Sequence, residues 1–448
     1  MFGTSGVRGP VGETVTADLA LSIGRAVGVS ADRVVLGRDA RDSGRALCDA
    51  LAAGLIESGT DVLEVGVAAT PTIARAVGEQ GCDAGFVVTA SHNPPKDNGI
   101  KLWSPSGQAF AGAKQETIAR RIEADDYALA AWDGHGERTA CEGAVAAHRD
   151  AITAAGRRRF DAIDADPAAL SVVVDVGNGT GGVTADALYE MGVDVETLNA
   201  APDGRFPARP SEPTAETCES LARCVDALDA DLGIAHDGDA DRMLAVDETG
   251  TFVPGDLLLA TFAREMADAG DAVAAPVDTS LVVEDALAEV GASLVHTRVG
   301  DVYVAERAKE ESVVFGGEPS GAWIFPAETL CPDGPLAAVT LAALAVEQPL
   351  SDRLDAFDPY PIRRTSIETD HRAAVVEAVR EAAQTIDGEL SELDGVRLSR
   401  EDGWFLVRAS GTQPLVRVTA EARDDGTAEE LFEEAKTLVT DAVADLGS

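Results

Sequence analysis

Short apolar runs alternate with helical stretches through most of this chain, and several runs end abruptly at small and polar residues. The runs at 33–37, 61–65 and 85–88 have the length of buried strands, while 17–28 and 45–58 follow the helical period. Strands that alternate with helices form a mostly parallel sheet covered by helices. The chain is therefore expected to be an α/β protein with its ligands at the carboxyl ends of strands.

The length of 448 residues is too great for one ordinary domain and suggests about three or four. After about residue 355 the pattern changes to α+β, with a strand at 361–369, a helix at 371–386 and a long strand at 395–409. We expect three similar mixed-sheet α/β domains and a C-terminal α+β domain. Their expected bounds are 1–138, 139–253, 254–354 and 355–448.

The formal net charge of −42 is extreme, and only five lysines are present among the 36 basic residues. A dispersed acidic surface of this kind is typical of halophiles, because salt screens the self-repulsion. It argues against nucleic acid and anionic membranes as partners, since phosphate backbones need a basic surface. No apolar run approaches the roughly 20 residues of a membrane helix, and the N-terminus lacks a signal-peptide pattern. We expect a cytoplasmic protein whose six cysteines are free thiols.

Ser91 follows the apolar run 85–88 in a loop that also contains His92. A serine hydroxyl is a weak nucleophile until a neighbouring group activates it. His92 offers a base, and Lys101 offers positive charge as well. The alternative interpretation is a surface turn, because Asn-Pro-Pro and Asn-Gly are common turn formers.

Asp237, Asp239 and Asp241 alternate with glycine and alanine between two expected strands, at 231–236 and 243–246. This spacing allows hard carboxylate oxygens to converge on one small cation. In so acidic a chain, a solvated turn between strands is the alternative.

The turn at 177–182 satisfies the dinucleotide pattern GxGxxG, and Glu196 lies at the end of the next strand, at 193–195. A nicotinamide-dependent dehydrogenase is therefore one alternative function. The pattern is short and common, and a tight turn in a βαβ unit is the favoured explanation.

Two further loops carry groups suited to phosphosugars. Glu318 and Ser320 lie in a glycine-rich loop, where a carboxylate and a hydroxyl suit vicinal sugar hydroxyls. Arg408 and Arg417 bracket a segment of small and hydroxyl residues, which suits a phosphate dianion. The residues expected to bind that phosphate are Arg408, Ser410, Gly411, Thr412 and Arg417.

Several of these segments resemble the α-D-phosphohexomutases, the superfamily of phosphoglucomutase, phosphomannomutase and phosphoglucosamine mutase. TASHNPPKDNGIK at 89–101 is similar to the family's phosphoserine loop, and DGDADR at 237–242 to its metal loop. GEPSG at 317–321 resembles the sugar-recognition loop, and RASGTQPLVR at 408–417 the phosphate-binding loop. They follow the family's order along nearly the whole chain. The resemblance implies four domains around a central cleft.

The resemblance also implies an activity, the interconversion of hexose 6-phosphate and hexose 1-phosphate through a hexose 1,6-bisphosphate. Ser91 would carry the phosphoryl group, and the three aspartates would bind Mg²⁺, with an oxygen of phosphorylated Ser91 as a further ligand. Arg8, from the GTSGVRG segment, and Arg242 would lie beside that phosphoryl group. Glu318 and Ser320 would bind the sugar. The protein would be a monomer or homodimer that binds a phosphosugar.

Two departures from the family pattern bear on proton transfer and on the substrate. Ala322 and Asp301 stand where several relatives have histidine, so Lys101 becomes the expected proton shuttle, with His92 second. The form VGDVYV at 299–304 resembles phosphoglucosamine mutases, and GEPSGAW resembles archaeal members. Glucosamine 6-phosphate is therefore the expected substrate. Phosphoglucomutase/phosphomannomutase activity is the alternative, and a phosphosugar-binding protein without turnover is a third.

Overall fold

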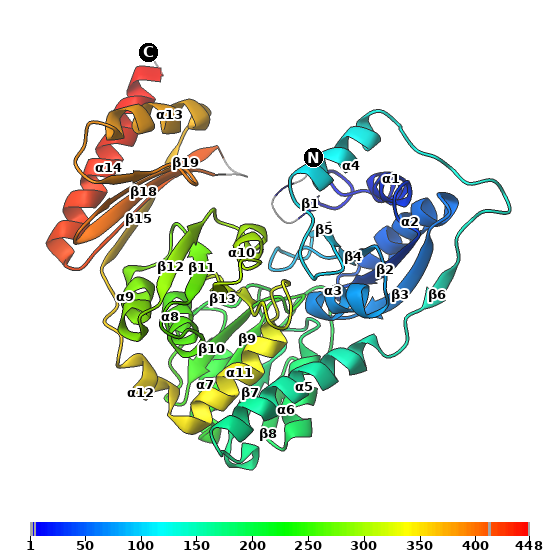
Figure 1. Cartoon of the computed structure of the whole chain (residues 1–448), viewed down its shortest axis with the longest axis horizontal. Helices are drawn as coiled ribbons and strands as arrows, with labels where there is room; N and C mark the ends of the chain where they lie inside the picture. Colours follow the sequence, from blue (N-terminus) through cyan, green and yellow to red (C-terminus); the bar gives the residue numbers. More distant parts are fainter. Residues whose placement is uncertain (1–2, 4–5, 411–413, 447–448) are drawn as a thin grey trace. The chain divides into compact units, whose positions relative to one another are not determined.

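The computed structural model describes residues 3, 6–410 and 414–446 (Figure 1). The chain forms two compact units. The first unit comprises Met1–Leu258 and Pro319–Leu354, and the second comprises Leu259–Glu318 and Asp355–Ser448. Within the described ranges, no helix is both long and apolar enough to cross a bilayer. All six cysteines are free thiols.

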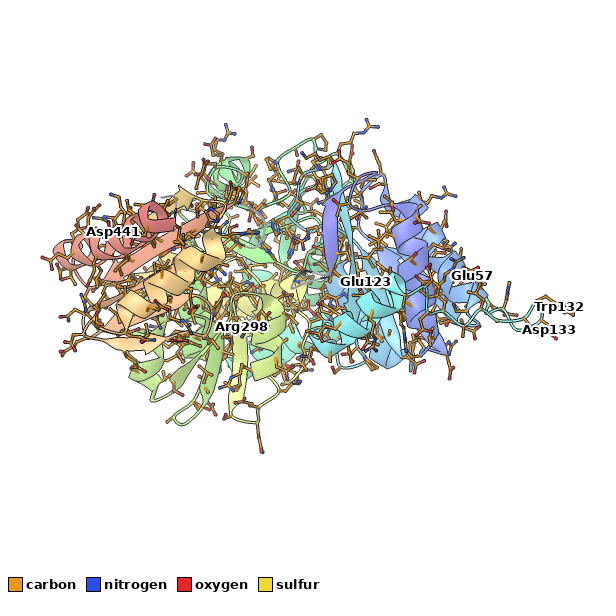
Figure 2. All side chains as sticks on the ribbon, turned by 90° about the horizontal axis from the view of Figure 1, so that it is seen from above. Glu57, Glu123, Trp132, Asp133, Arg298 and Asp441 are labelled. Carbon is orange, nitrogen blue, oxygen red and sulfur yellow. The ribbon has the colours of Figure 1, made fainter. Side chains whose placement is uncertain are left out.

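A six-stranded sheet begins the first unit, in the order β1-β5-β4-β2-β3-β6 (Figure 1). Its strands are β1 (Val7–Pro10), β2 (Arg33–Arg38), β3 (Asp61–Val67), β4 (Ala84–Val88), β5 (Asp97–Trp103) and β6 (Arg138–Ala140). Its helices are α1 (Ala17–Gly28), α2 (Gly44–Glu57), α3 (Thr70–Glu79) and α4 (Ala113–Glu123). The connection after α4 carries Trp132, whose side chain is 88% exposed (Figure 2). Strands β2, β3, β4 and β6 are parallel, as the alternation predicts.

Strand β5 is absent from the sequence-based expectation, which treats residues 89–101 as one loop. It pairs antiparallel with both β4 and β1. Its first residues, Asp97, Asn98 and Gly99, have low strand propensity. Pairing on both sides overrides that preference and places Lys101 on a buried strand.

A second sheet of the first unit has the order β10-β9-β7-β8. Its strands are β7 (Ser171–Asp175), β8 (Asp194–Leu198), β9 (Leu232–His236) and β10 (Met243–Asp247). The helices of this part are α5 (Ala144–Ala162), α6 (Gly182–Met191), α7 (Glu219–Leu228), α11 (Gly334–Glu347) and α12 (Leu350–Leu354). A 3-10 turn at Pro167–Ala169 and the short strand β14 (Trp323–Ile324) also belong to this unit. Strands β9 and β10 form an antiparallel hairpin with 237–242 as its loop. Helix α8 (Gly255–Met266) spans the point where the first unit gives way to the second.

The second unit contains a parallel group, β12 (Ser293–Thr297), β11 (Ala272–Pro276) and β13 (Val313–Gly317), in that spatial order. Helices α9 (Leu281–Val290) and α10 (Asp301–Arg307) accompany it. A five-stranded antiparallel sheet follows, in the order β15-β19-β18-β17-β16. Its elements are β15 (Ile362–Glu368), α13 (Arg372–Ala383), β16 (Glu389–Ser391), β17 (Val396–Arg400), β18 (Gly403–Ala409), β19 (Leu415–Ala422) and α14 (Asp425–Leu446).

The expected long strand at 395–409 is instead a tight hairpin of β17 and β18, which pair antiparallel. Glu401 and Asp402 form the turn and Gly403 begins β18, so the break falls where turn-forming residues interrupt the apolar pattern. One face of this sheet packs against α13 and α14. On the other face, Trp404 and Leu406 pack against Val277 and Leu281 of the parallel group. The sheet and the end of β11 are thereby joined by a small apolar core.

Candidate functional site

Ser91 lies just beyond β4 and is 2% exposed. Its hydroxyl Oγ donates a hydrogen bond to Oδ2 of Asp237 at 2.5 Å and lies 3.5 Å from Oδ1 of Asp241. Its φ of 49° is in the left-handed region, which costs a non-glycine residue roughly 1–2 kcal/mol. Such a conformation persists only where the surroundings fix it, and it is common at functional sites.

Arg41 fixes this loop from beneath. Its side chain is fully buried and its Nε lies 3.0 Å from Oδ2 of Asp39. The two terminal nitrogens donate to three backbone carbonyls of the loop, Ser91 at 2.8 Å, Asn93 at 2.6 Å and Pro94 at 2.7 Å, and to the carbonyl of Asp97, the first residue of β5, at 2.9 Å. The Arg41 guanidinium thus holds the backbone of the serine loop, residues 89–96, in one conformation.

Residues from the loop before α7 complete the support. The Ser211 hydroxyl donates to the Ser91 carbonyl at 2.9 Å and accepts from the Gly238 N–H at 2.9 Å. The Phe206 ring covers the Arg41 guanidinium, with 5.0 Å between Cζ and the ring centroid. One hydroxyl thereby ties the serine loop to the β9–β10 hairpin.

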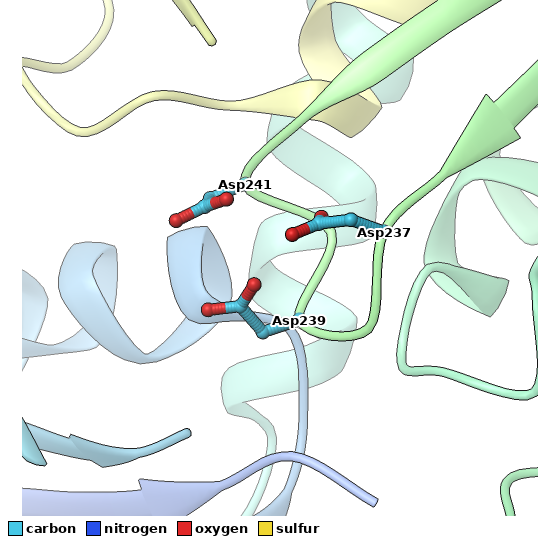
Figure 3. Close-up of side chains that lie close together, drawn as sticks. All are labelled: Asp237, Asp239 and Asp241. Atoms are coloured by element: carbon cyan, nitrogen blue, oxygen red, sulfur yellow. The ribbon is translucent and has the colours of Figure 1, made fainter. Parts of the chain in front are cut away.

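The three aspartates of that hairpin form a compact cluster, called the aspartate cluster below (Figure 3). One carboxylate oxygen from each of Asp237, Asp239 and Asp241 lies within 4.8 Å of the others, and all three side chains are buried. The Thr70 hydroxyl, at the start of α3, donates to Oδ2 of Asp239 at 2.6 Å. The other oxygen of Asp239, Oδ1, is buried and has no hydrogen-bond partner among the residues that the structure describes.

Crowding of buried negative charge governs how these carboxylates titrate. Burial raises the pKa of Asp237 well above its usual value, and the charges of Asp239 and Asp241 raise it further. Burial likewise raises the pKa of Asp241. For Asp239 burial acts upward too, but Lys101 and the Thr70 hydrogen bond outweigh it, so its pKa is lowered. An unpartnered buried oxygen within a set of hard oxygen donors fits a small divalent cation, such as Mg²⁺.

Lys101 is the counter-ion of the cluster. Its Nζ lies 2.9 Å from Oδ2 of Asp239 and also forms an ion pair with Asp241. Burial alone would lower the pKa of Lys101, but the two carboxylates outweigh burial and raise it. The amine therefore holds its proton firmly while it faces both carboxylates.

His92 is the other nitrogen group beside the serine. Its Nδ1 lies 3.4 Å from Oγ of Ser91. Burial, followed by the charges of Arg242, Arg8 and Lys101, lowers the pKa of His92 to about 2. The imidazole is therefore neutral at physiological pH and is a weak base.

Arg8 and Arg242 line the same region. Arg8 lies on β1, and its Nη1 donates to Oδ1 of Asn93 in the serine loop at 3.3 Å. The Arg242 backbone N–H donates to Oδ1 of Asp237 at 3.3 Å, and its Nη1 is 3.5 Å from Glu212. Their charges both act on His92. The charges of both arginines thus act on the residue that follows Ser91, and their contact with a phosphoryl group stays a prediction.

The glycine turn, residues 177–182, packs against the aspartate hairpin. A Cβ on Gly179 would lie 2.6 Å from the Gly238 carbonyl oxygen, and one on Gly181 would lie 2.7 Å from the His236 ring. The Thr180 N–H donates to the same Gly238 carbonyl at 3.1 Å. Close approach to protein atoms thus explains Gly179 and Gly181, and the turn holds the hairpin from this side as well.

The two expected sugar-binding residues belong to different units, and each has a clear local setting. Glu318, in the second unit, is 8% exposed and accepts a hydrogen bond from the Gly300 N–H at 2.7 Å. Ser320, in the first unit, is half-buried. Ala322, two residues further, pairs with Arg242 in an isolated β-bridge. Asp301 begins helix α10.

The expected phosphate-binding residues lie at one end of the five-stranded sheet. Arg408 and Arg417 are directly opposite each other on β18 and β19. Arg408 forms an ion pair with Asp394 at 3.0 Å, and the buried Ser410 donates its N–H to the Leu415 carbonyl at 2.9 Å. Gly411 and Thr412 lie outside the described residues. Arg408 and Arg417 both line a pocket in the second unit.

Arg41, Thr70 and Ser211 were not among the site residues expected from the sequence. Arg41 lies in GRDARDSG directly after strand β2, where a buried arginine between aspartates signals a structural charge. Thr70 precedes Pro71 at the first turn of α3, and the start of a helix after a strand is a common place for site residues. Ser211 lies between prolines in an irregular loop, where no sequence signal identifies it.

Sequence models of four domains cover most of this chain. They describe the phosphoglucomutase/phosphomannomutase alpha/beta/alpha domains I, II and III, at residues 1–129, 147–250 and 254–360, and the C-terminal domain, at 365–438. The chain belongs to the phosphoglucomutase/phosphomannomutase family. Its activity is accordingly that of a phosphohexomutase, an isomerase, and the expected fold class of three α/β domains and a C-terminal domain is confirmed.

Relatives match over nearly the full length. A probable phosphoglucosamine mutase of Methanosarcina acetivorans is 44% identical over 99% of both chains. That of Methanococcoides burtonii is 42% identical over 99% of both. A phosphoglucomutase/phosphomannomutase family protein of Burkholderia thailandensis has a similar structure, with a TM-score of 0.84, 27% identity and coverage of 99% of this chain and 98% of its own.

Proposed function

We propose that this phosphohexomutase interconverts glucosamine 6-phosphate and glucosamine 1-phosphate, with Ser91 as phosphoryl carrier and Mg²⁺ on the aspartate cluster. The observation that carries the proposal is the Ser91 hydroxyl, 2.5 Å from an oxygen of the three-aspartate cluster. The choice of glucosamine is supported by the archaeal relatives, several of which are named probable phosphoglucosamine mutases at about 40% identity. Phosphoglucomutase/phosphomannomutase activity is the competing outcome of the test below.

In the proposed reaction, phosphorylated Ser91 gives its phosphoryl group to the C1 hydroxyl of a hexose 6-phosphate. The bond between phosphorus and Oγ of Ser91 breaks, a bond from phosphorus to the sugar oxygen forms, and one proton moves from the sugar hydroxyl to Oγ of Ser91. The bisphosphate then turns end for end and returns its 6-phosphoryl group to Ser91. When bound, Mg²⁺ would neutralise charge on the transferring group.

The chain's own residues supply position and charge. Arg41 and Ser211 fix the carbonyl of Ser91, so the hydroxyl keeps one direction. Arg8 and Arg242 are proposed to contact the transferred phosphoryl group as bidentate donors. Lys101 is proposed to relay the hydroxyl proton: its ammonium group would give a proton to Oγ of Ser91 and regain one from the sugar hydroxyl, with neutral His92 as the second candidate.

The remaining assignments complete the proposal. Glu318 and Ser320 are proposed to bind sugar hydroxyls in both orientations, and Arg408, Ser410, Gly411, Thr412 and Arg417 to bind the phosphate that is not transferred. We also propose that the domain boundaries lie near residues 138, 253 and 354. A phosphosugar is the proposed partner, with a hexose 1,6-bisphosphate as activator.

A coupled mutase assay tests the proposal on glucosamine, glucose and mannose 6-phosphates, each primed with its 1,6-bisphosphate. We expect the highest kcat/KM with glucosamine 6-phosphate. Chelation of Mg²⁺ or the substitution Ser91→Ala should lower kcat by about 10⁴-fold or more, because the carrier hydroxyl or its charge partner is lost. Ser220→Ala, on the exposed face of α7, is the matched control. Activity that survives Ser91→Ala would overturn the mechanism, and a preference for glucose or mannose would overturn the substrate.

A further inference from the structure

A pocket of about 340 Å³ lies within the second unit, where residues of the five-stranded sheet face Asp278, just after β11. Its charged lining consists of Asp278, Arg364, Arg408 and Arg417. The volume is at the lower end of the range for small-molecule sites. We call this site the arginine pocket.

Strand register places the three arginines on one face of the sheet. Arg417 of β19 is directly opposite Arg408 of β18. Arg364 of β15 is opposite Thr419, two residues along β19 from Arg417, and side chains two residues apart point to the same face. The pocket therefore contains a third arginine, Arg364, next to the pair Arg408 and Arg417 that the sequence identifies.

The three arginines of this pocket differ in whether they form an ion pair with the protein. Arg408 forms an ion pair with Asp394, which also accepts the Val299 N–H at 3.1 Å. Within the described part of the chain, the guanidinium groups of Arg364 and Arg417 make no hydrogen bond or ion pair. Two donors of this kind in a concave site suit a phosphate dianion.

Asp278 is the acidic exception in this basic lining. It lies two residues after the end of β11, between the buried residues Val277 and Thr279. A carboxylate repels a phosphate, so its presence beside three arginines is unexpected in a site for phosphate alone. It makes no ion pair with a described residue, which leaves the carboxylate available to a cation of the ligand.

We propose that Asp278 binds the ammonium group of a 2-amino-2-deoxyhexose phosphate, while Arg364 joins Arg408 and Arg417 in binding its phosphate. The inference rests on the proposed function, and it names the residue that would select an amino sugar at that site. Neither Asp278 nor Arg364 is among the residues assigned above.

Charge balance favours this ligand over a neutral sugar phosphate. Three guanidinium groups with the carboxylates of Asp278 and Asp394 leave the pocket with one net positive charge. An aminohexose phosphate with a dianionic phosphate and an ammonium group carries one net negative charge, so the complex is neutral. A hexose phosphate without the amine would leave the complex with one uncompensated negative charge, which is costly in a partly desolvated site.

The electrostatic setting of Asp278 agrees with this assignment. Burial raises the pKa of Asp278, and the charge of Arg408 opposes the rise only in part. The carboxylate of the ligand-free pocket is therefore under-compensated. A ligand ammonium within the pocket would stabilise it, whereas a sugar hydroxyl at the same place would provide only a neutral donor.

The test compares Asp278→Asn with the wild-type enzyme on glucosamine 6-phosphate and glucose 6-phosphate. The substitution keeps the shape and removes the charge. We expect the ratio of kcat/KM for the two substrates to fall about tenfold or more, and the ratio of their dissociation constants by titration calorimetry to change in parallel. Arg364→Gln should weaken binding of both ligands about equally, since both carry the phosphate. Asp441→Asn, on the outer surface of α14 (Figure 2), is the control for loss of one surface charge.

The outcomes separate the two proposals. A wild-type enzyme that prefers glucose 6-phosphate overturns the glucosamine assignment and this inference with it. A wild-type preference for the amino sugar that Asp278→Asn leaves unchanged overturns only the role of Asp278. If the variant does not fold, the wild type is titrated with glucosamine 6-phosphate and 2-deoxyglucose 6-phosphate. Equal affinities for these two ligands would also overturn the inference.

Discussion

Arg41 and Arg417 show two opposite uses of the same side chain. Arg41 is fully buried, and its guanidinium is matched by Asp39 and by four backbone carbonyls, three in the serine loop and one at the start of β5. Arg417 is exposed at the arginine pocket, where its guanidinium has no hydrogen bond or ion pair with a described residue. The first arginine shapes the protein, and the second remains available to a ligand. Charge satisfaction, rather than residue type, distinguishes a structural arginine from a binding one.

The largest expected effect tests that distinction directly. Arg41→Met should destabilise the protein by about 3–5 kcal/mol, because Asp39 and the loop carbonyls are left buried without their donor. Arg417→Met should change the free energy of unfolding by less than about 0.5 kcal/mol, because no hydrogen bond or ion pair to a described residue is lost. Urea unfolding of both variants, followed by circular dichroism, measures the two effects.

Ligand binding tests the role of Arg417 separately from stability. Arg417→Met should weaken the binding of glucosamine 6-phosphate about tenfold through the loss of a charged donor. Arg41→Lys is the conservative variant for the stability measurement. It should still destabilise the protein, because a single ammonium group cannot donate to four carbonyls and a carboxylate at once. Equal destabilisation by Arg41→Met and Arg417→Met would contradict the comparison.

The aspartate cluster provides the second test, because its charge is matched only in part by Lys101. The pKa values of Asp237 and Asp241 are raised in the folded protein, so without a cation their contribution to stability is fully present below the ordinary value of 3.8. That contribution is lost as the pH rises through the folded pKa. At neutral pH, Mg²⁺ at 100 times its dissociation constant should therefore add about 2.7 kcal/mol to the free energy of unfolding.

Asp237→Asn separates the two parts of this prediction. The variant should lose most of the Mg²⁺-dependent increment, and without metal it should be more stable than wild type at pH 7, since one buried like charge is gone. Thermal unfolding between pH 4 and pH 8, with Mg²⁺ and with chelator, measures both. Asp441→Asn should keep the wild-type response. An Mg²⁺ increment in Asp237→Asn equal to that of wild type would exclude the cluster as the metal site.

Local pattern predicted the fold class and brought forward the serine and the aspartates as candidates. Strand periodicity located β2, β3 and β4 because their apolar residues are continuous. Strand β5 was missed because Asp97, Asn98 and Gly99 favour turns, and only pairing with β1 and β4 makes them extended. A strand that is stabilised mainly by pairing with distant strands is hard to predict from its own residues.

The same reason explains which parts of the site could not be foreseen. Ser91 and Asp237 are each marked by a local motif, although 146 positions separate them. Arg41 is recognised only through hydrogen bonds to backbone carbonyls about 50 residues away, and backbone acceptors carry no residue identity. Ser211 bridges two loops through one hydroxyl. Contacts to backbone atoms are invisible to a motif, because any residue could supply the acceptor.

The glycine turn offers the smallest expected effect and the sharpest contrast between two glycines of one motif. Gly179→Ala should destabilise the protein by about 1–3 kcal/mol, since its Cβ would lie 2.6 Å from the Gly238 carbonyl oxygen. Gly182→Ala should be neutral or stabilising by up to about 1 kcal/mol. Gly182 begins α6 and has open space where a Cβ would lie, and alanine has the higher helix propensity.

Measuring Mg²⁺ affinity in both variants relates this contrast to the aspartate cluster. Because the Thr180 N–H donates to the Gly238 carbonyl, displacement of the turn in Gly179→Ala should shift the hairpin that carries Asp237 and Asp239. Metal affinity should fall in that variant and remain unchanged in Gly182→Ala. In a dinucleotide site the third glycine of the motif would be required for close packing of the helix on the strand. Loss of stability or activity in Gly182→Ala, with Gly179→Ala unaffected, would therefore favour the dinucleotide interpretation over the packing role observed here.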